Sequence, residues 1–219
     1  MKRLLTLPLA LFLVLSLAAC SEGGDQTADM TKEDMLAAAE TVDAAALAGE
    51  TTDDPAAAQE TYCGKILEIT APISAIEEDY IRLRIGDNVT PARLDVYLPA
   101  EELADLSDDQ QVTVVGITAP KIEKQTAEGS TIPVYYYTMS SGYVTQTRFE
   151  MTCSLVGPDL ANNAFYLNDG TSVQKRVYFQ NGVEVPTDIW GKEIRIAGTI
   201  LYDEGSSTYY EVYDAELLQ

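Results

Sequence analysis

Three arginines and a tyrosine occupy alternate positions in two short segments of the chain. In each segment polar and apolar residues alternate, and the polar positions hold Arg82, Arg84, Arg93, Asp95 and Tyr97. Because successive side chains of a strand point to opposite faces, these groups are expected together on an outer face. An arginine can hold a carboxylate or phosphate with two hydrogen bonds, and a tyrosine can stack on a base or sugar ring. The spacing therefore predicts a candidate ligand face of Arg82, Arg84, Arg93 and Tyr97, with a solvated face of Arg–Asp pairs as the alternative.

A pair of cysteines is the second chemical candidate. Beyond the amino-terminal Cys20, the chain holds two cysteines, Cys63 and Cys153. An even number of cysteines in an exported chain permits a disulfide, and Cys63 and Cys153 each fall in the first strand expected for one half of the chain. The alternative is two separate buried thiols, which pack as small apolar residues. There is no Cys-x-x-Cys motif, which argues against a redox site.

Several kinds of catalytic and metal site are excluded or disfavoured. The sequence contains no histidine, which excludes Ser-His-Asp and Cys-His catalysis and zinc sites built on histidine. The acidic cluster at Asp105, Asp108 and Asp109 lacks the alternating ligands and closing Glu of a calcium loop. Neither a glycine-rich phosphate loop nor a G-x-S-x-G motif is present. We therefore predict no catalytic residue, no cofactor and no metal ligand.

Net charge narrows the choice of partners. Lys and Arg number 14 against 35 Asp and Glu, which gives a net charge of −21 and an isoelectric point near 4.1. Such a surface repels nucleic acid and anionic lipid, whose nonspecific binding depends on Lys and Arg. A glycan, a small molecule or another protein remains as the expected ligand.

The amino terminus has the pattern of a secretory signal. Lys2 and Arg3 precede an apolar run of about 14 residues, which is shorter than the roughly 20 needed to span a bilayer. The residues Leu17-Ala18-Ala19-Cys20 then resemble the lipobox of bacterial lipoproteins. The resemblance implies a signal peptide over 1–19 and a mature protein that begins at a lipid-bearing Cys20. An ordinary signal peptide whose cleavage site precedes a cysteine is the alternative.

Residues 20–60 are expected to link this anchor to a folded body. Residues 20–30 are rich in Gly, Asp, Ser and Thr, which indicates a flexible tether. Thr31 to Asp34 resemble a capping box, and apolar residues then recur at helical spacing as far as Gly49. The pattern predicts a helix and loop over 31–60, with one amphipathic helix over about 31–48.

From residue 61 onward the apolar period changes to two, which predicts short strands. The first half has expected strands at about 61–71, 79–86, 92–98, 112–116 and 134–145. The second half repeats the order with strands at about 147–156, 163–168, 173–180, 193–199 and 209–217. In both halves a short helical segment follows the third strand, which is the order of the five-stranded Greek-key OB-fold. We predict a mainly β protein of two tandem OB-like barrels, over 61–145 and 146–219, with a two-part β-sandwich as the alternative.

A family resemblance accompanies this pattern. The stretch Gly191-Lys192-Glu193-Ile194-Arg195-Ile196-Ala197-Gly198, followed by a tyrosine-rich strand, resembles the tRNA-anticodon-binding-like OB proteins found as small bacterial lipoproteins. The resemblance implies a fold and a tendency to bind ligands.

Together these features predict a non-enzymatic protein held at the cell membrane by lipid, on the extracytoplasmic side. Its OB-like domains would bind a glycan, a small molecule or a protein partner. Two alternatives remain at this point: a glycan hydrolase that uses two carboxylates brought together by the fold, and a structural spacer without a binding site.

Overall fold

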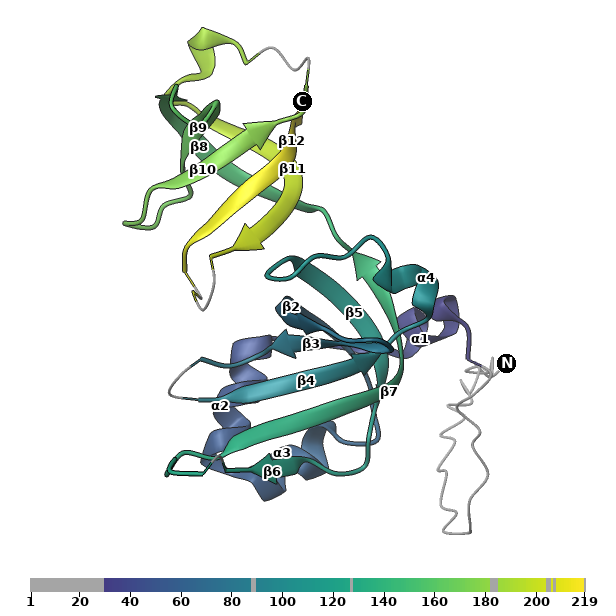
Figure 1. Ribbon diagram of the computed structural model, residues 1–219. Helices are drawn as coiled ribbons and strands as arrows, with labels where there is room; N and C mark the ends of the chain where they lie inside the picture. Colours follow the sequence, from purple (N-terminus) through teal and green to yellow (C-terminus); the bar gives the residue numbers. More distant parts are fainter. Residues whose placement is uncertain are drawn as a thin grey trace, which may run out of the picture.

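The computed structural model describes residues 30–87, 90–126, 128–181, 185–203, 206 and 208–218 (Figure 1). The predicted signal peptide 1–19, the predicted lipid-attachment residue Cys20 and almost all of the predicted tether 20–30 lie outside these residues. Within the described part, no helix is both long enough and apolar enough to cross a membrane.

A segment of short helices precedes the first barrel and differs from the single helix expected over 31–48. The observed elements are α1 (Lys32–Ala38), β1 (Glu40–Val42), α2 (Ala44–Asp53) and α3 (Pro55–Tyr62). The capping box at Thr31 and Asp34 is confirmed. Asp43 accepts a hydrogen bond from Ala46 N and so begins a new helix. The apolar spacing alone could not show that residues 40–42 form a strand, β1, which pairs in parallel with a strand of the first barrel.

The first barrel is a closed sheet of five strands. Its strands are β2 (Ile66–Ile76), β3 (Tyr80–Arg84), β4 (Ala92–Tyr97), β5 (Gln111–Thr118) and β7 (Val134–Gln146). They pair in the order β2-β3-β4-β7-β5, and β5 pairs with β2 to close the barrel. The short helix α4 (Ala100–Leu103) follows the third of these strands, and β6 (Glu123–Gln125), which lies between β5 and β7 in the chain, pairs with β7.

The second barrel repeats this arrangement with its own apolar core. Its strands are β8 (Phe149–Asp159), β9 (Ala164–Asn168), β10 (Lys175–Phe179), β11 (Glu193–Tyr202) and β12 (Tyr210–Leu218), and the 3-10 helix η1 (Thr187–Ile189) follows the third. The closed order β10-β12-β11-β8-β9 matches that of the first barrel strand for strand. Closure of both sheets confirms the predicted pair of OB-like barrels and overturns the β-sandwich alternative.

The barrels touch through the β11–β12 end of the second and the start of β5 in the first. Tyr202 N donates to Asp109 O at 2.9 Å, and Tyr202 Oη donates to Gln111 Oε1 at 3.1 Å. An isolated bridge pairs Gln110 with Leu201. Figure 1 shows the second barrel, green to yellow, above the first.

A buried hydrogen bond ties the helical segment to the first barrel. Tyr137 of β7 is 1% exposed, and its hydroxyl lies 2.6 Å from Thr51 Oγ1 of α2. Thr51 Oγ1 donates to Leu47 O at 2.5 Å, so its oxygen accepts from the tyrosine. Burial raises the pKa of Tyr137 to about 12, so the hydroxyl stays protonated at neutral pH.

We expect Tyr137→Phe to lower the free energy of unfolding by about 1 kcal/mol, because a buried hydrogen bond is lost and Thr51 keeps an unused acceptor. Urea denaturation of the full chain measures this change. Tyr97→Phe is the matched control, since Tyr97 is 38% exposed. Equal stability of the two variants would contradict the account.

Candidate functional site

The predicted ligand residues lie on the outer surface of β3, β4 and β7. Across β3 and β4, Tyr80 pairs with Tyr97, Arg82 with Asp95, and Arg84 with Arg93, while β7 places Tyr136 opposite Arg93. We call this set of residues the first-barrel face: Tyr80, Arg82, Arg84, Arg93, Asp95, Tyr97 and Tyr136. The alternate residues of β3 and β4 are fully buried in the barrel core, which turns these side chains outward.

Arg82 forms the centre of the first-barrel face. Its Nε and Nη2 donate to the two carboxylate oxygens of Asp95 at 2.7 and 2.8 Å. Its guanidinium also lies 5.6 Å from the ring centre of Tyr80 and 5.3 Å from that of Tyr136. The hydrogen bonds to Asp95 raise the pKa of Arg82. This arginine is therefore neutralised in the way that the Arg–Asp alternative describes, and it orders the aromatic rings around it.

Two tyrosines form an open end of the face. The ring centres of Tyr80 and Tyr97 are 5.2 Å apart with a tilt of 38°. Tyr97 is 38% exposed and borders a groove of about 320 Å³ whose other walls include Asp79, Pro99 and Tyr143. An exposed ring beside a groove provides a stacking surface for a ligand ring.

Arg84 points toward the second barrel and does not join Arg82 as a free ligand group. Its Nη2 donates to Ser206 O at 3.0 Å and lies 3.8 Å from Asp109 Oδ1. Arg84 therefore helps to hold the two barrels together, and its predicted part in ligand binding stays a prediction. The alternation of polar and apolar residues in β3 predicts that Arg84 points outward, but it does not predict that the second barrel lies next to this side chain.

Arg93 is half-buried between β3 and β7. Its Nη1 donates to the carbonyl oxygen of Ala92 at 2.9 Å. In the described part of the chain, no carboxylate oxygen lies within 4 Å of its guanidinium. Burial lowers the pKa of Arg93, and the positive charges of Arg84 and Arg82 lower it further. Arg82 and Arg84 each have an acidic partner, so Arg93 is the one of the three predicted arginines that lacks one among the described residues.

The second barrel carries a related surface. Arg176 Nε donates to Asp159 Oδ2 at 2.8 Å, and its Nη1 donates to Glu211 Oε1 at 2.9 Å. Beside it the rings of Tyr178 and Tyr213 stack with centres 4.6 Å apart. These carboxylates come from β8 and β12, so only the closed barrel brings them to the arginine.

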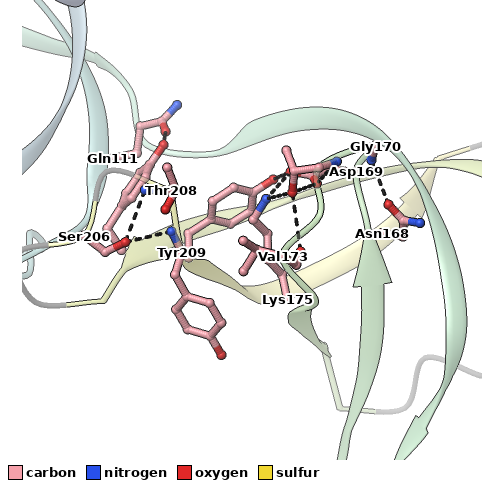
Figure 2. A network of polar contacts seen from close by, with 12 residues as sticks. Gln111, Asn168, Asp169, Gly170, Val173, Lys175, Ser206, Thr208 and Tyr209 are labelled. Atoms are coloured by element: carbon pink, nitrogen blue, oxygen red, sulfur yellow. Dashed lines mark hydrogen bonds and ion pairs between the residues drawn. The ribbon is translucent and has the colours of Figure 1, made fainter.

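A buried charge network closes one end of the second barrel. Lys175 is 1% exposed, and its Nζ donates to Asp169 and lies 4.4 Å from the ring centre of Tyr210. Tyr210 Oη donates to Asp169 Oδ2 at 2.6 Å. Although burial opposes ionisation, hydrogen bonds from Lys175, Tyr210 and Thr171 hold the pKa of Asp169 well below its usual range. Figure 2 shows dashed contacts between Asp169 and Lys175, and full mutual pairing indicates a structural role.

A groove of about 570 Å³ lies where the barrels meet. Its lining combines four acidic residues, one arginine, one leucine and three tyrosines: Asp108, Asp109, Asp203, Glu211, Arg176, Leu201, Tyr202, Tyr209 and Tyr213. Among the residues that the structure describes, no group of three or more His, Cys, Asp or Glu side chains is arranged to hold a metal ion.

A family model matches residues 1–127. This range is more than half of the chain and extends through β6 of the first barrel. The chain belongs to the tRNA_anti-like family. The match falls on the first half, whereas the sequence resemblance was drawn from residues 191–198 of the second half.

Two further comparisons concern this tRNA_anti-like chain as a whole. No curated protein matches it. A crystal structure from Klebsiella pneumoniae subsp. pneumoniae MGH 78578, of a protein provisionally described as a nucleic acid-binding lipoprotein, is similar with 22% sequence identity and a TM-score of 0.37. The similarity covers 53% of this chain and 100% of the Klebsiella chain.

The two described cysteines of the tRNA_anti-like chain are free thiols, and the predicted disulfide is absent. Cys63 ends α3 and packs against the core of the first barrel, so it is not in a first strand as expected. Cys153 is buried in the core of the second barrel. Two thiols that belong to separate cores cannot be bridged without moving the backbone.

We expect alkylation of the folded protein at pH 8 to modify Cys63 before Cys153. Burial raises the pKa of both thiols, and that of Cys153 reaches about 12, so less of Cys153 is present as the reactive thiolate. Mass spectrometry of the alkylated peptides separates the two sites, and guanidinium-unfolded protein, in which both react, is the control. Protection of both until a reductant is added would contradict the free-thiol structure.

Proposed function

We propose that this tRNA_anti-like protein is a non-enzymatic, lipid-anchored protein of the cell envelope that binds a ligand on its first-barrel face. The observation that carries the binding proposal is the exposed ring of Tyr97 beside a groove, packed against Tyr80 next to the Arg82–Asp95 pair. These residues lie on the second and third strands of the barrel, and OB-folds bind oligonucleotides and oligosaccharides on this surface.

The charge of the chain favours a glycan or small molecule over nucleic acid. With a net charge of −21, the protein repels a phosphate backbone at long range. Arg82, at the centre of the face, is already neutralised by Asp95, so it adds little net attraction for a polyanion. Stacking and local hydrogen bonds are then the main sources of affinity.

The carboxylates whose pKa is shifted argue against the glycan-hydrolase alternative. A catalytic acid needs a raised pKa to be protonated near neutral pH. Asp159, Asp169 and Glu211, three carboxylates of the described residues, each have a lowered pKa. These groups are held as carboxylates, which suits structural ion pairs.

The anchoring part of the proposal rests on the sequence Leu17-Ala18-Ala19-Cys20 and the short apolar run before it. Acyl chains on Cys20 would hold the protein at the extracytoplasmic side of the membrane, and two or more chains give a firm anchor. The acidic body would be repelled by anionic headgroups, so the tether would depend on these chains.

We expect Cys20→Ser to abolish incorporation of a labelled fatty acid into the protein. The reason is that the acyl chains are proposed to be attached through this residue and its sulfur. Metabolic labelling followed by gel fluorescence measures the effect, and Cys63→Ser is the matched control that keeps the label. A label that persists in Cys20→Ser would overturn the proposed anchor.

We expect Tyr97→Ala to weaken binding of a responsive glycan by about tenfold, since aromatic stacking is worth roughly 1 kcal/mol or more per ring. A thermal-shift screen of neutral and acidic oligosaccharides identifies the glycan, and calorimetry measures the affinity. Trp190→Ala is the control, because Trp190 is an exposed aromatic residue (41%) on the second barrel. Equal loss in both variants, or no loss in Tyr97→Ala, would place the site elsewhere.

A further inference from the structure

The two barrels place an arginine at the same point of the same strand pair. In the first barrel Arg93 of β4 lies opposite Tyr136 of β7, in a parallel pairing. In the second barrel Arg176 of β10 lies opposite Glu211 of β12, also in a parallel pairing. In both barrels these are the third and fifth strands. The surroundings of Arg93 can therefore be compared directly with those of Arg176, the arginine at the equivalent position.

The surroundings of the two arginines differ in charge. Arg176 is neutralised twice, by Asp159 and by Glu211. Arg93 has Tyr136 where the second barrel has Glu211, and its partner on β3 is another arginine, Arg84. Like charges directly opposite each other in a sheet are destabilising, and Arg84 is directed toward the second barrel, where its Nη2 donates to Ser206 O. The first barrel therefore keeps a half-buried positive charge that the second barrel cancels.

The donors of Arg93 that have no partner among the described residues define what would bind there. A guanidinium has five N–H donors in a flat fork, and one donor of Arg93 is used on Ala92 O. The planar fork matches the two oxygens of a carboxylate or phosphate. An anion placed there would also offset the repulsion between Arg93 and Arg84.

The aromatic residue beside Arg93, Tyr136, indicates the kind of molecule to which the anionic group would belong. Tyr136 lies directly beside Arg93 in the ladder, and its ring is oriented by the guanidinium of Arg82 at 5.3 Å. Tyr136 is partly exposed, and a tyrosine ring packs well against the apolar side of a sugar ring.

We propose that Arg93 is the anion-binding residue of the first-barrel face, and that it takes the phosphate or carboxylate group of an acidic sugar whose ring lies against Tyr136. This inference rests on the proposed binding function and adds the ligand class to it. Arg82 orders the ring beside the site, and Arg84 contributes positive potential from the barrel interface.

Four probes on the full mature chain test this inference by calorimetry: glucose, glucose 6-phosphate, glucuronate and inorganic phosphate. We expect at least one of the two charged sugars to bind at least about tenfold more tightly than glucose. Comparison of glucose 6-phosphate with glucuronate then shows whether the site prefers a phosphate or a carboxylate. Arg93→Gln is expected to reduce binding of the charged sugar to the level of glucose. Arg93→Lys is expected to recover only part, because an ammonium keeps the charge without the fork.

Arg176→Gln is the matched control, with the same change at the equivalent position of the second barrel. It is expected to leave sugar affinity unchanged while lowering the melting temperature, because Asp159 and Glu211 lose their partner. Arg93→Gln is expected to keep or raise the melting temperature, because it removes a positive charge that lies opposite Arg84 in the strand pair. A fall in melting temperature for Arg93→Gln as large as that for Arg176→Gln would overturn the inference by showing a structural role.

Other results separate this inference from the broader proposal. Equal affinity for glucose and both charged sugars, or unchanged affinity in Arg93→Gln, would overturn the anion site. The binding function of the face would still stand if Tyr97→Ala weakened that same binding. Inorganic phosphate that binds as tightly as glucose 6-phosphate would overturn the contact between the sugar ring and Tyr136.

Discussion

The register between β3 and β4 is the constraint on which the first-barrel face depends. Ile81, Leu83, Leu94 and Val96 are fully buried in the barrel, and this burial fixes which side chains point outward. A slip of one residue would place arginines in the core and leucines in water, so the apolar core specifies the register strongly. Closure through β2 and β5 then holds the same strands at a fixed curvature. The polar surface is thus positioned by the apolar core beneath it.

Neutralisation of the few positive charges is the second theme of the structure. In a chain with a net charge of −21, an arginine or lysine readily finds a carboxylate: Arg82 has Asp95, Lys175 has Asp169, and Arg176 has two partners. Arg93 lies instead between another arginine and a tyrosine. Because the chain carries a net charge of −21 and repels anions at long range, binding of an anionic ligand at Arg93 would depend on local contacts and would be selective.

Much of this arrangement follows from local sequence. Alternation in residues 81–98 predicts that Arg82, Arg93 and Tyr97 point outward, and the repeated strand order predicts the two barrels. Local alternation could not predict contacts between distant segments of the chain. Arg84, for example, donates to Ser206 O because the second barrel lies beside β3. The helix expected over 31–48 was wrong for a similar reason, since pairing with β2 draws Glu40–Val42 into a strand. Local pattern thus predicts direction, and tertiary contact decides which charges remain unpaired.

The most direct test of the account follows the arginine side chains themselves. Nuclear magnetic resonance of the Nε–Hε groups, recorded while glucose 6-phosphate or glucuronate is added to the mature protein, reports each guanidinium separately once assigned by substitution. The account predicts that the signal of Arg93 moves with saturation and that the signal of Arg176 stays in place. A shift of Arg176 in place of Arg93, or no shift of any arginine signal with either sugar, would contradict it.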